Sequence, residues 1–177
     1  MLTPFFHFSK MIGMNKHIAL GIDSDGVLAQ FDERVLELTG VTPNVLDGQG
    51  ALWSTLVKYP TFFRDLAPYR EMVDLYHEIK NKVGYVRVIT GRPRKDGFPA
   101  ASDHKREWVK EHLDANLDVI VCLSRDKQKY ISKSHDIDIL IDDRVDNINR
   151  WIKAGGVGIL HTSAATTRET LLNLLNL

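Results

Sequence analysis

The residues best suited to chemistry are four acidic side chains, which occur as two pairs far apart in the chain. Asp23 and Asp25 flank a single serine, and Asp142 and Asp143 are adjacent. Carboxylates gathered in one place repel one another and lose solvation, so a site built from both pairs requires a counter-charge. Oxygen-only ligands favour a hard cation. Mg²⁺, which keeps several waters and accepts a substrate phosphate, fits this donor set best.

Two further polar groups stand between these pairs, Thr90-Gly91-Arg92 and Ser124-Arg125-Asp126-Lys127. A hydroxyl, a glycine N–H and a lysine are groups that bind phosphoryl oxygens. Each motif alone is weak, because an Asp-x-Asp is common in solvated turns and an acidic residue suits a helix N-cap. The informative feature is that all four groups directly follow apolar runs.

Those apolar runs predict the elements that must position the polar residues. Five runs are typical of buried strands: His17–Ile22, Tyr85–Ile89, Asp118–Leu123, Ile137–Ile141 and Val157–Leu160. Amphipathic segments between them predict helices at Glu71–Ile79, Lys105–Leu113 and Arg144–Ala154, and we expect the last to bury Val145, Ile148, Trp151 and Ile152. Alternating strands and helices predict an α/β fold with a mostly parallel sheet, whose carboxyl-end loops converge on one crevice.

The stretch 31–68 departs from this alternation, because it holds helix-like pieces and two prolines, Pro43 and Pro60, without a convincing strand. It directly follows the first strand, so we expect a small helical cap over the carboxyl edge of the sheet. The predicted organisation is a flexible leader at 1–16, a core domain at 17–30 and 69–177, and a cap at 31–68.

Composition limits the class of protein. The 23 Lys+Arg balance the 23 Asp+Glu, and this zero net charge weighs against a protein that mainly grips nucleic-acid phosphates or anionic membranes. The single cysteine, Cys122, excludes an internal disulfide framework. No stretch of the sequence approaches the roughly 18 apolar residues needed to span a bilayer.

Taken in order, DSDGVL, VITGR, the lysine of SRDK and ILIDDR resemble the four motifs of the haloacid dehalogenase (HAD) superfamily of phosphohydrolases. The resemblance covers about Ile18 to Leu160 and is closest to the 5′(3′)-deoxyribonucleotidase family. The more discriminating matches are the SRDK block and the segment Lys105-x-x-Trp108-Val109. The resemblance implies a HAD-like Rossmannoid three-layer fold with a mostly parallel central sheet and a small helical cap inserted after the first strand.

It also implies a Mg²⁺-dependent, cytoplasmic phosphatase that acts on a small phosphomonoester, in particular a (deoxy)nucleoside monophosphate. Asp23 would be the nucleophile that forms an aspartyl-phosphate, and Asp25 the acid/base that protonates the leaving group. Mg²⁺ would take the Asp23 carboxylate, the Asp25 carbonyl and a carboxylate of Asp142 or Asp143. The residues leave the last choice open, and the nucleotidase resemblance favours Asp143.

The expected substrate contacts are spread over the remaining motifs. Thr90, Gly91 and Lys127 would bind the phosphoryl group, and Lys105 and Arg125 are further candidates for phosphate or base. Phe31 aligns with a base-contacting phenylalanine of the resembled nucleotidases. For Trp53, Phe62 and Phe63, packing within the cap is the favoured interpretation.

One departure keeps a second enzyme hypothesis open. The nucleotidases usually carry Thr-Ser-Pro where this chain has Thr90-Gly91-Arg92-Pro93, and the basic run continues to Lys95. Gly-Arg and Asp-Asp-Arg are similar to the 3′-phosphatase domain of polynucleotide kinases, so a nucleic-acid end is the less favoured alternative substrate. A phospho-acceptor signalling receiver is a weaker alternative, because the acidic pair follows the other motifs in the chain. A catalytically silent binding protein is also weaker, because each motif keeps its reactive group.

Overall fold

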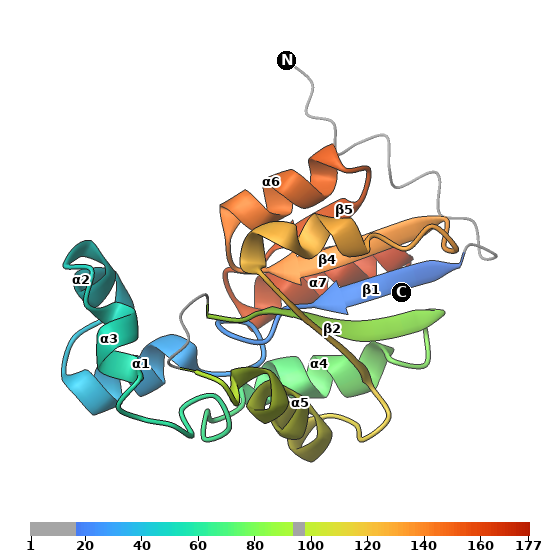
Figure 1. Ribbon diagram of the computed structural model, residues 1–177. Helices are drawn as coiled ribbons and strands as arrows, with labels where there is room; N and C mark the ends of the chain where they lie inside the picture. Colours follow the sequence, from blue (N-terminus) through green and yellow to red (C-terminus); the bar gives the residue numbers. More distant parts are fainter. Residues whose placement is uncertain (1–16, 94–97) are drawn as a thin grey trace.

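The computed structural model describes residues 17–93 and 98–177, so the leader predicted at 1–16 and the basic residues Arg94 and Lys95 lie outside the described residues. Its centre is a five-stranded sheet (Figure 1). The strands are β1 (Ile18–Ile22), β2 (Tyr85–Gly91), β3 (Asp118–Cys122), β4 (Ile137–Asp142) and β5 (Val157–Leu160). They pair in parallel in the order β3-β2-β1-β4-β5.

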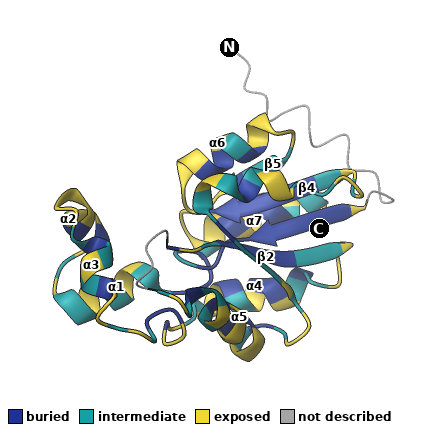
Figure 2. Cartoon of the chain, viewed as in Figure 1, coloured by how far each residue is buried: buried dark blue, intermediate teal, exposed yellow. Residues whose placement is uncertain are grey.

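Helices cover both faces of the sheet. On one face, α4 (Arg70–Ile79), α5 (Ala101–His112) and α7 (Ala164–Leu175) pack on Leu20, Ile22 and the strand residues beside them. On the other, α6 (Val145–Lys153) packs on Ile89 and Leu140, next to the 3₁₀ helix η2 (Ser124–Tyr130). Alternate strand residues face opposite sides of a sheet, so β2 and β4 supply both apolar clusters, whereas β1 supplies only the first. The inner strands are largely buried (Figure 2).

The five predicted strands and the parallel sheet are confirmed, with small changes in their ends. Strand β2 continues through Thr90 and Gly91, and β4 includes Asp142. Three of the proposed site residues, Thr90, Gly91 and Asp142, therefore lie in strands rather than in loops. The C-terminal helix α7 was not predicted; it begins after Ser163, whose side-chain oxygen accepts a hydrogen bond from the Thr166 N–H at 3.2 Å.

The predicted burial along α6 is correct for Ile148 and Trp151 and wrong for two neighbours. Val145 and Ile152 are 54% and 52% exposed, whereas Trp151 is fully buried. The residues that face the sheet, Asn147, Ile148 and Trp151, follow the three-to-four-residue helical repeat, and a polar residue fills the first place of that stripe. Val145 and Ile152 lie beside this stripe, at the two ends of a short helix.

Between β1 and α4 the chain forms α1 (Phe31–Thr39), α2 (Pro43–Gly48) and α3 (Leu52–Leu56), grouped to one side of the sheet (Figure 1). The two ends of this stretch are joined by backbone contacts. Ala29 forms an isolated antiparallel β-bridge with Pro68, and the Gln30 N–H donates a hydrogen bond to the Ala67 carbonyl at 2.9 Å. One apolar cluster runs from these helices into the sheet, so the division into a core and a cap domain stays a prediction. Among the described residues no helix combines the length and apolarity needed to cross a membrane.

Candidate active site

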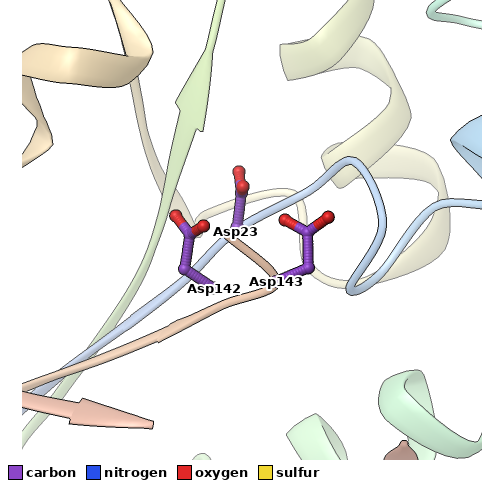
Figure 3. A group of neighbouring side chains, drawn as sticks. All are labelled: Asp23, Asp142 and Asp143. Carbon is purple, nitrogen blue, oxygen red and sulfur yellow. The ribbon is translucent and has the colours of Figure 1, made fainter. Parts of the chain in front are cut away.

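Three carboxylates meet at the carboxyl ends of β1 and β4. Asp23 follows β1, Asp142 ends β4 and Asp143 comes next. They lie side by side and point the same way (Figure 3). One oxygen from each lies within 4.8 Å of the others. This is the only group of three or more potential metal-ligating side chains found among the described residues. Parallel pairing of β1 and β4 explains how residues 119 positions apart become neighbours.

Lys127, carried by η2, is the buried counter-charge of this group. Its Nζ lies 2.7 Å from Asp23 Oδ2 and 2.6 Å from Asp142 Oδ2, and its side chain is 1% exposed. Burial opposes the charged ammonium, but attraction to Asp23 and Asp142 outweighs it and raises the pKa of Lys127. Lys127 pairs with Asp23 and Asp142, and Asp143 has no ion pair with a described residue, so three carboxylates are set against one ammonium in this group.

Asp142 and Asp143 differ in how their oxygens are used. Asp142 is fully buried and accepts hydrogen bonds from Lys127, from the Arg144 N–H at 2.9 Å and from Asn147 Nδ2 at 3.0 and 3.1 Å. Asp143 is exposed at the pocket and has no ion pair with a described residue. Lost solvation, with repulsion from Asp23 next, raises the pKa of Asp142 to about 6 and that of Asp143 to about 7. The exposed carboxylate of Asp143 is thus the better placed of the two to bind a cation directly.

Asp25 pairs with a different lysine. Lys105 Nζ, from α5, lies 2.6 Å from both Asp25 oxygens and 3.3 Å from Thr90 Oγ1. The lysine is 1% exposed and its ammonium lies 4.4 Å from the centre of the Phe63 ring. Burial raises the pKa of Asp25, opposed by Lys105 and reinforced by Asp23. Lys105, a candidate contact for phosphate or base, is thus a buried lysine whose observed partner is the second carboxylate of the Asp-x-Asp.

A pocket of about 430 Å³ opens in front of the carboxylates. Its lining includes Asp23, Asp25 and Asp143 together with residues of α1–α3. Gly26 makes this geometry possible. Its φ is +76°, and a Cβ there would lie 2.6 Å from Asp143 Oδ2, so only glycine combines the turn with room for that carboxylate.

Aromatic rings form the apolar wall of the pocket. Phe31, Trp53 and Phe63 line it, and Phe31 lies 6.3 Å from Trp53 and 6.4 Å from Phe63 between ring centroids. Phe62 is 2% exposed and packs in the core, as expected. Trp53 and Phe63 combine packing in the apolar cluster with a place in the pocket wall. Phe98, which the sequence did not single out, contacts both of these rings.

The structure gathers most, but not all, of the residues proposed from the sequence. Asp23, Asp25, Asp142 and Asp143 come together with Lys127, Lys105 and Thr90, and Gly91 and Phe31 line the pocket. Arg125 is exposed on η2 and is not among the lining residues, so its role stays a prediction.

Asn147 was missed by sequence reasoning. It is 2% exposed and joins Asp142 to Ser124, whose Oγ lies 3.0 Å from Asn147 Nδ2. Its only signal in the sequence was its position one helical turn after Asp143, on the face that was expected to be apolar.

Comparison with solved structures identifies the fold. A hydrolase from Streptococcus pneumoniae TIGR4 superposes with a TM-score of 0.50 at 17% identity, covering 88% of this chain and 98% of that one. The phosphoserine phosphatase of T. onnurineus gives 0.51 at 17% identity, covering 93% and 96%. A protein of Burkholderia xenovorans LB400 described as haloacid dehalogenase-like gives 0.50 at 12% identity, covering 82% and 81%. The fold is HAD-like.

Residues 41–170 match the sequence model of a protein family, the 5′ nucleotidase, deoxy (pyrimidine), cytosolic type C proteins. The chain belongs to this family. The matched range includes Lys105, Lys127, Asp142 and Asp143 and begins after Asp23 and Asp25. A search of curated protein sequences gave no match. Family membership confirms the phosphatase interpretation and does not support the signalling-receiver alternative.

Proposed function

We propose that the chain is a Mg²⁺-dependent 5′-nucleotidase that hydrolyses (deoxy)nucleoside monophosphates in the cytoplasm. The observation that carries the proposal is that one pocket is lined both by carboxylates of the triad beside a buried lysine and by aromatic rings. The charged groups suit a phosphate and the rings suit a flat base. The cytosolic type in the family's description supports the location.

The donor set fits a divalent cation. The triad sets three carboxylates against the single ammonium of Lys127, and its possible ligand atoms are all oxygens. Asp23 and Asp143 would hold Mg²⁺ together with the Asp25 carbonyl, and Asp142 would orient Lys127 and stay beside the metal. When bound, the cation would neutralise phosphate charge and align the phosphoryl group for attack.

The reaction consists of two successive displacements at phosphorus, and different side chains act in each. Asp23 attacks phosphorus, forming an aspartyl-phosphate as the bond to the nucleoside oxygen breaks. Asp25 gives a proton to that departing oxygen and later takes one from the water that releases inorganic phosphate. Lys127, Thr90 and the Gly91 N–H stabilise the charge on the phosphoryl oxygens.

Lys105 is better suited to hold Asp25 than to bind phosphate. Its ammonium already contacts both Asp25 oxygens and Thr90 Oγ1, and Phe63 covers it. A lysine so placed fixes the direction in which the Asp25 carboxyl group points. We therefore assign it a positioning role within the proposed mechanism.

The experiment that tests the function is phosphate release from a panel of phosphomonoesters, with and without EDTA. The panel contains dUMP, dTMP, dGMP, 3′-nucleotides, sugar phosphates and a 3′-phosphorylated oligonucleotide. We expect turnover of 5′-mononucleotides that EDTA abolishes and Mg²⁺ restores. Turnover confined to sugar phosphates, or none on any mononucleotide, would refute the proposal.

A second candidate, a polynucleotide 3′-phosphatase, rests on Arg92 and Arg144. Both line the pocket, both are exposed, and neither has an ion pair with a described residue. These cations could meet the phosphates of a longer strand. This candidate predicts preferred turnover of the 3′-phosphorylated oligonucleotide with a strong decrease in rate as salt rises.

A further inference from the structure

A buried ion pair away from the pocket lining lies on the sheet face that carries η2 and α6. Arg87 of β2 and Asp138 of β4 meet with Nη2 and Oδ2 2.6 Å apart, and both side chains are 2% exposed. Strand β1 lies between their strands, so the pair reaches across it. It does so where β1 offers only small residues, because Gly21 is in register with Arg87 and Ala19 with Asp138.

The pair holds the chain immediately after η2. Arg87 Nη2 donates to the Tyr130 carbonyl at 3.0 Å, and Asp138 Oδ2 accepts from the Ser132 N–H at 2.6 Å. Tyr130 is the last residue of η2. A 3₁₀ helix has three residues per turn, so Tyr130 lies one turn after Lys127. The ion pair therefore fixes the backbone one turn from the lysine that contacts Asp23.

Stability is a poor explanation for this pair. Arg87 Nε, Arg87 Nη1 and Asp138 Oδ1 are buried without a hydrogen-bond partner among the described residues. Burying a charge pair costs solvation, and unsatisfied polar atoms add to that cost, so an apolar pair of similar volume is often equally or more stabilising. An apolar pair could not form the hydrogen bonds to the Tyr130 carbonyl and from the Ser132 N–H.

Lys127 needs its backbone held from outside the site. Its side chain is long and flexible, and its two partners are the nucleophile Asp23 and the metal-neighbouring Asp142. In the proposed reaction the ammonium must also meet phosphoryl oxygens, so these contacts cannot by themselves keep the lysine in place. The first residue of η2, Ser124, is held by Asn147 at 3.0 Å. The end of η2 is held by the Arg87–Asp138 pair.

We propose that Arg87 and Asp138 are positioning residues for the phosphoryl-transfer step, acting through η2 on Lys127. The inference rests on the proposed function, because it assumes that Lys127 stabilises the transferred phosphoryl group. It adds a role for two residues that touch neither substrate nor metal. Loss of the pair should lower kcat and leave KM nearly unchanged, since the pocket lining is untouched.

The test replaces both partners together, as Arg87→Met/Asp138→Leu, because removing one would leave a buried charge alone. Turnover of p-nitrophenyl phosphate and of dUMP is measured with the full chain, with and without Lys127→Ala. We expect kcat to fall about 10- to 100-fold with KM within about threefold, the scale of a small misplacement of a catalytic group. In the Lys127→Ala background the same double change should cost no further activity.

Two controls separate positioning from general destabilisation. Leu171→Ala removes a fully buried side chain on the opposite face of the sheet, so it should lower the melting temperature and leave kcat unchanged below the transition. Arg87→Lys keeps a cation opposite Asp138 and should lose less than tenfold. If the apolar pair does not fold, Arg87→Lys carries the same comparison with Lys127→Ala.

Unchanged kcat in the folded double variant would overturn the inference. So would a loss of the same size with and without Lys127, since the pair would then act by another route. Failure of the proposed function looks different: the wild-type chain would not hydrolyse dUMP, or Lys127→Ala alone would keep full activity.

Discussion

Gly26 gives the sharpest prediction about the metal site. Its φ of +76° places it in the left-handed region, and a Cβ there would lie 2.6 Å from Asp143 Oδ2 and 2.9 Å from Asp143 Cγ. The substitution Gly26→Ala therefore has two expected effects. It strains the backbone, because alanine disfavours this φ, and its Cβ displaces the Asp143 carboxyl group from its place beside Asp23.

The chain contains a matched control that separates these two effects. Gly40 has nearly the same φ, +75°, but a Cβ there would meet nothing within 4 Å. Both alanine variants should lose about 1–2 kcal/mol from left-handed strain, a fall of roughly 2–8 °C in melting temperature for a chain of this size. Only Gly26→Ala should also weaken Mg²⁺, by about 10- to 100-fold, the loss typical of a disturbed metal environment.

The assay is a Mg²⁺ titration of phosphate release for the wild type and both variants, with melting curves recorded in EDTA. We expect similar melting temperatures for the two variants and a raised Mg²⁺ requirement for Gly26→Ala alone. Equal Mg²⁺ requirements in all three proteins would refute the assignment of Asp143 as a direct ligand.

Three further predictions test the electrostatics and the pocket. Asp142 and Asp143 have pKa values raised from 3.8 to about 6 and about 7, so between about pH 4 and pH 7 the folded metal-free protein holds protons more tightly than the unfolded chain. Its melting temperature should therefore fall as pH rises through that range, and Mg²⁺ should raise it more at pH 8 than at pH 5; thermal shift assays at both pH values, giving equal Mg²⁺ effects, would contradict this. Lys105→Met should lower kcat by about 10- to 100-fold with little change in KM, because Asp25 loses the contact that orients it; steady-state kinetics on dUMP check this, and a purely raised KM would instead mark Lys105 as a substrate ligand. Phe31→Ala should raise KM for dUMP about tenfold and leave KM for a sugar phosphate nearly unchanged, and equal effects on both substrates would remove its role in holding the base.

The strand framework could be predicted from the sequence because each strand is a short apolar run that ends in a polar residue. Parallel pairing then brings the ends of β1 and β4 together, so the neighbourhood of Asp23 and Asp142 follows from topology. The phosphatase class could be predicted because the residues at these strand ends resemble the four HAD motifs.

Pairings between side chains could not be predicted in the same way. Lys105 and Asp25 are 80 residues apart, and a helix sequence does not reveal which of its lysines is buried. The Arg87–Asp138 pair spans an intervening strand, so it depends on strand order as well as on residue type. On α6, the apolar character of Val145 and Ile152 was misleading because buried Asn147 takes a place on the face that packs against the sheet.

The central claim is that Asp23 is the nucleophile of a phosphatase acting on mononucleotides. The most direct measurement mixes excess enzyme with ³²P-labelled dUMP and Mg²⁺, quenches in acid within milliseconds to seconds, and locates the label by peptide mass spectrometry. We predict a transient acyl-phosphate on Asp23 that disappears as free phosphate forms, and no phosphoenzyme or turnover for a folded Asp23→Asn variant. Label on another residue, or full turnover by Asp23→Asn, would contradict the account.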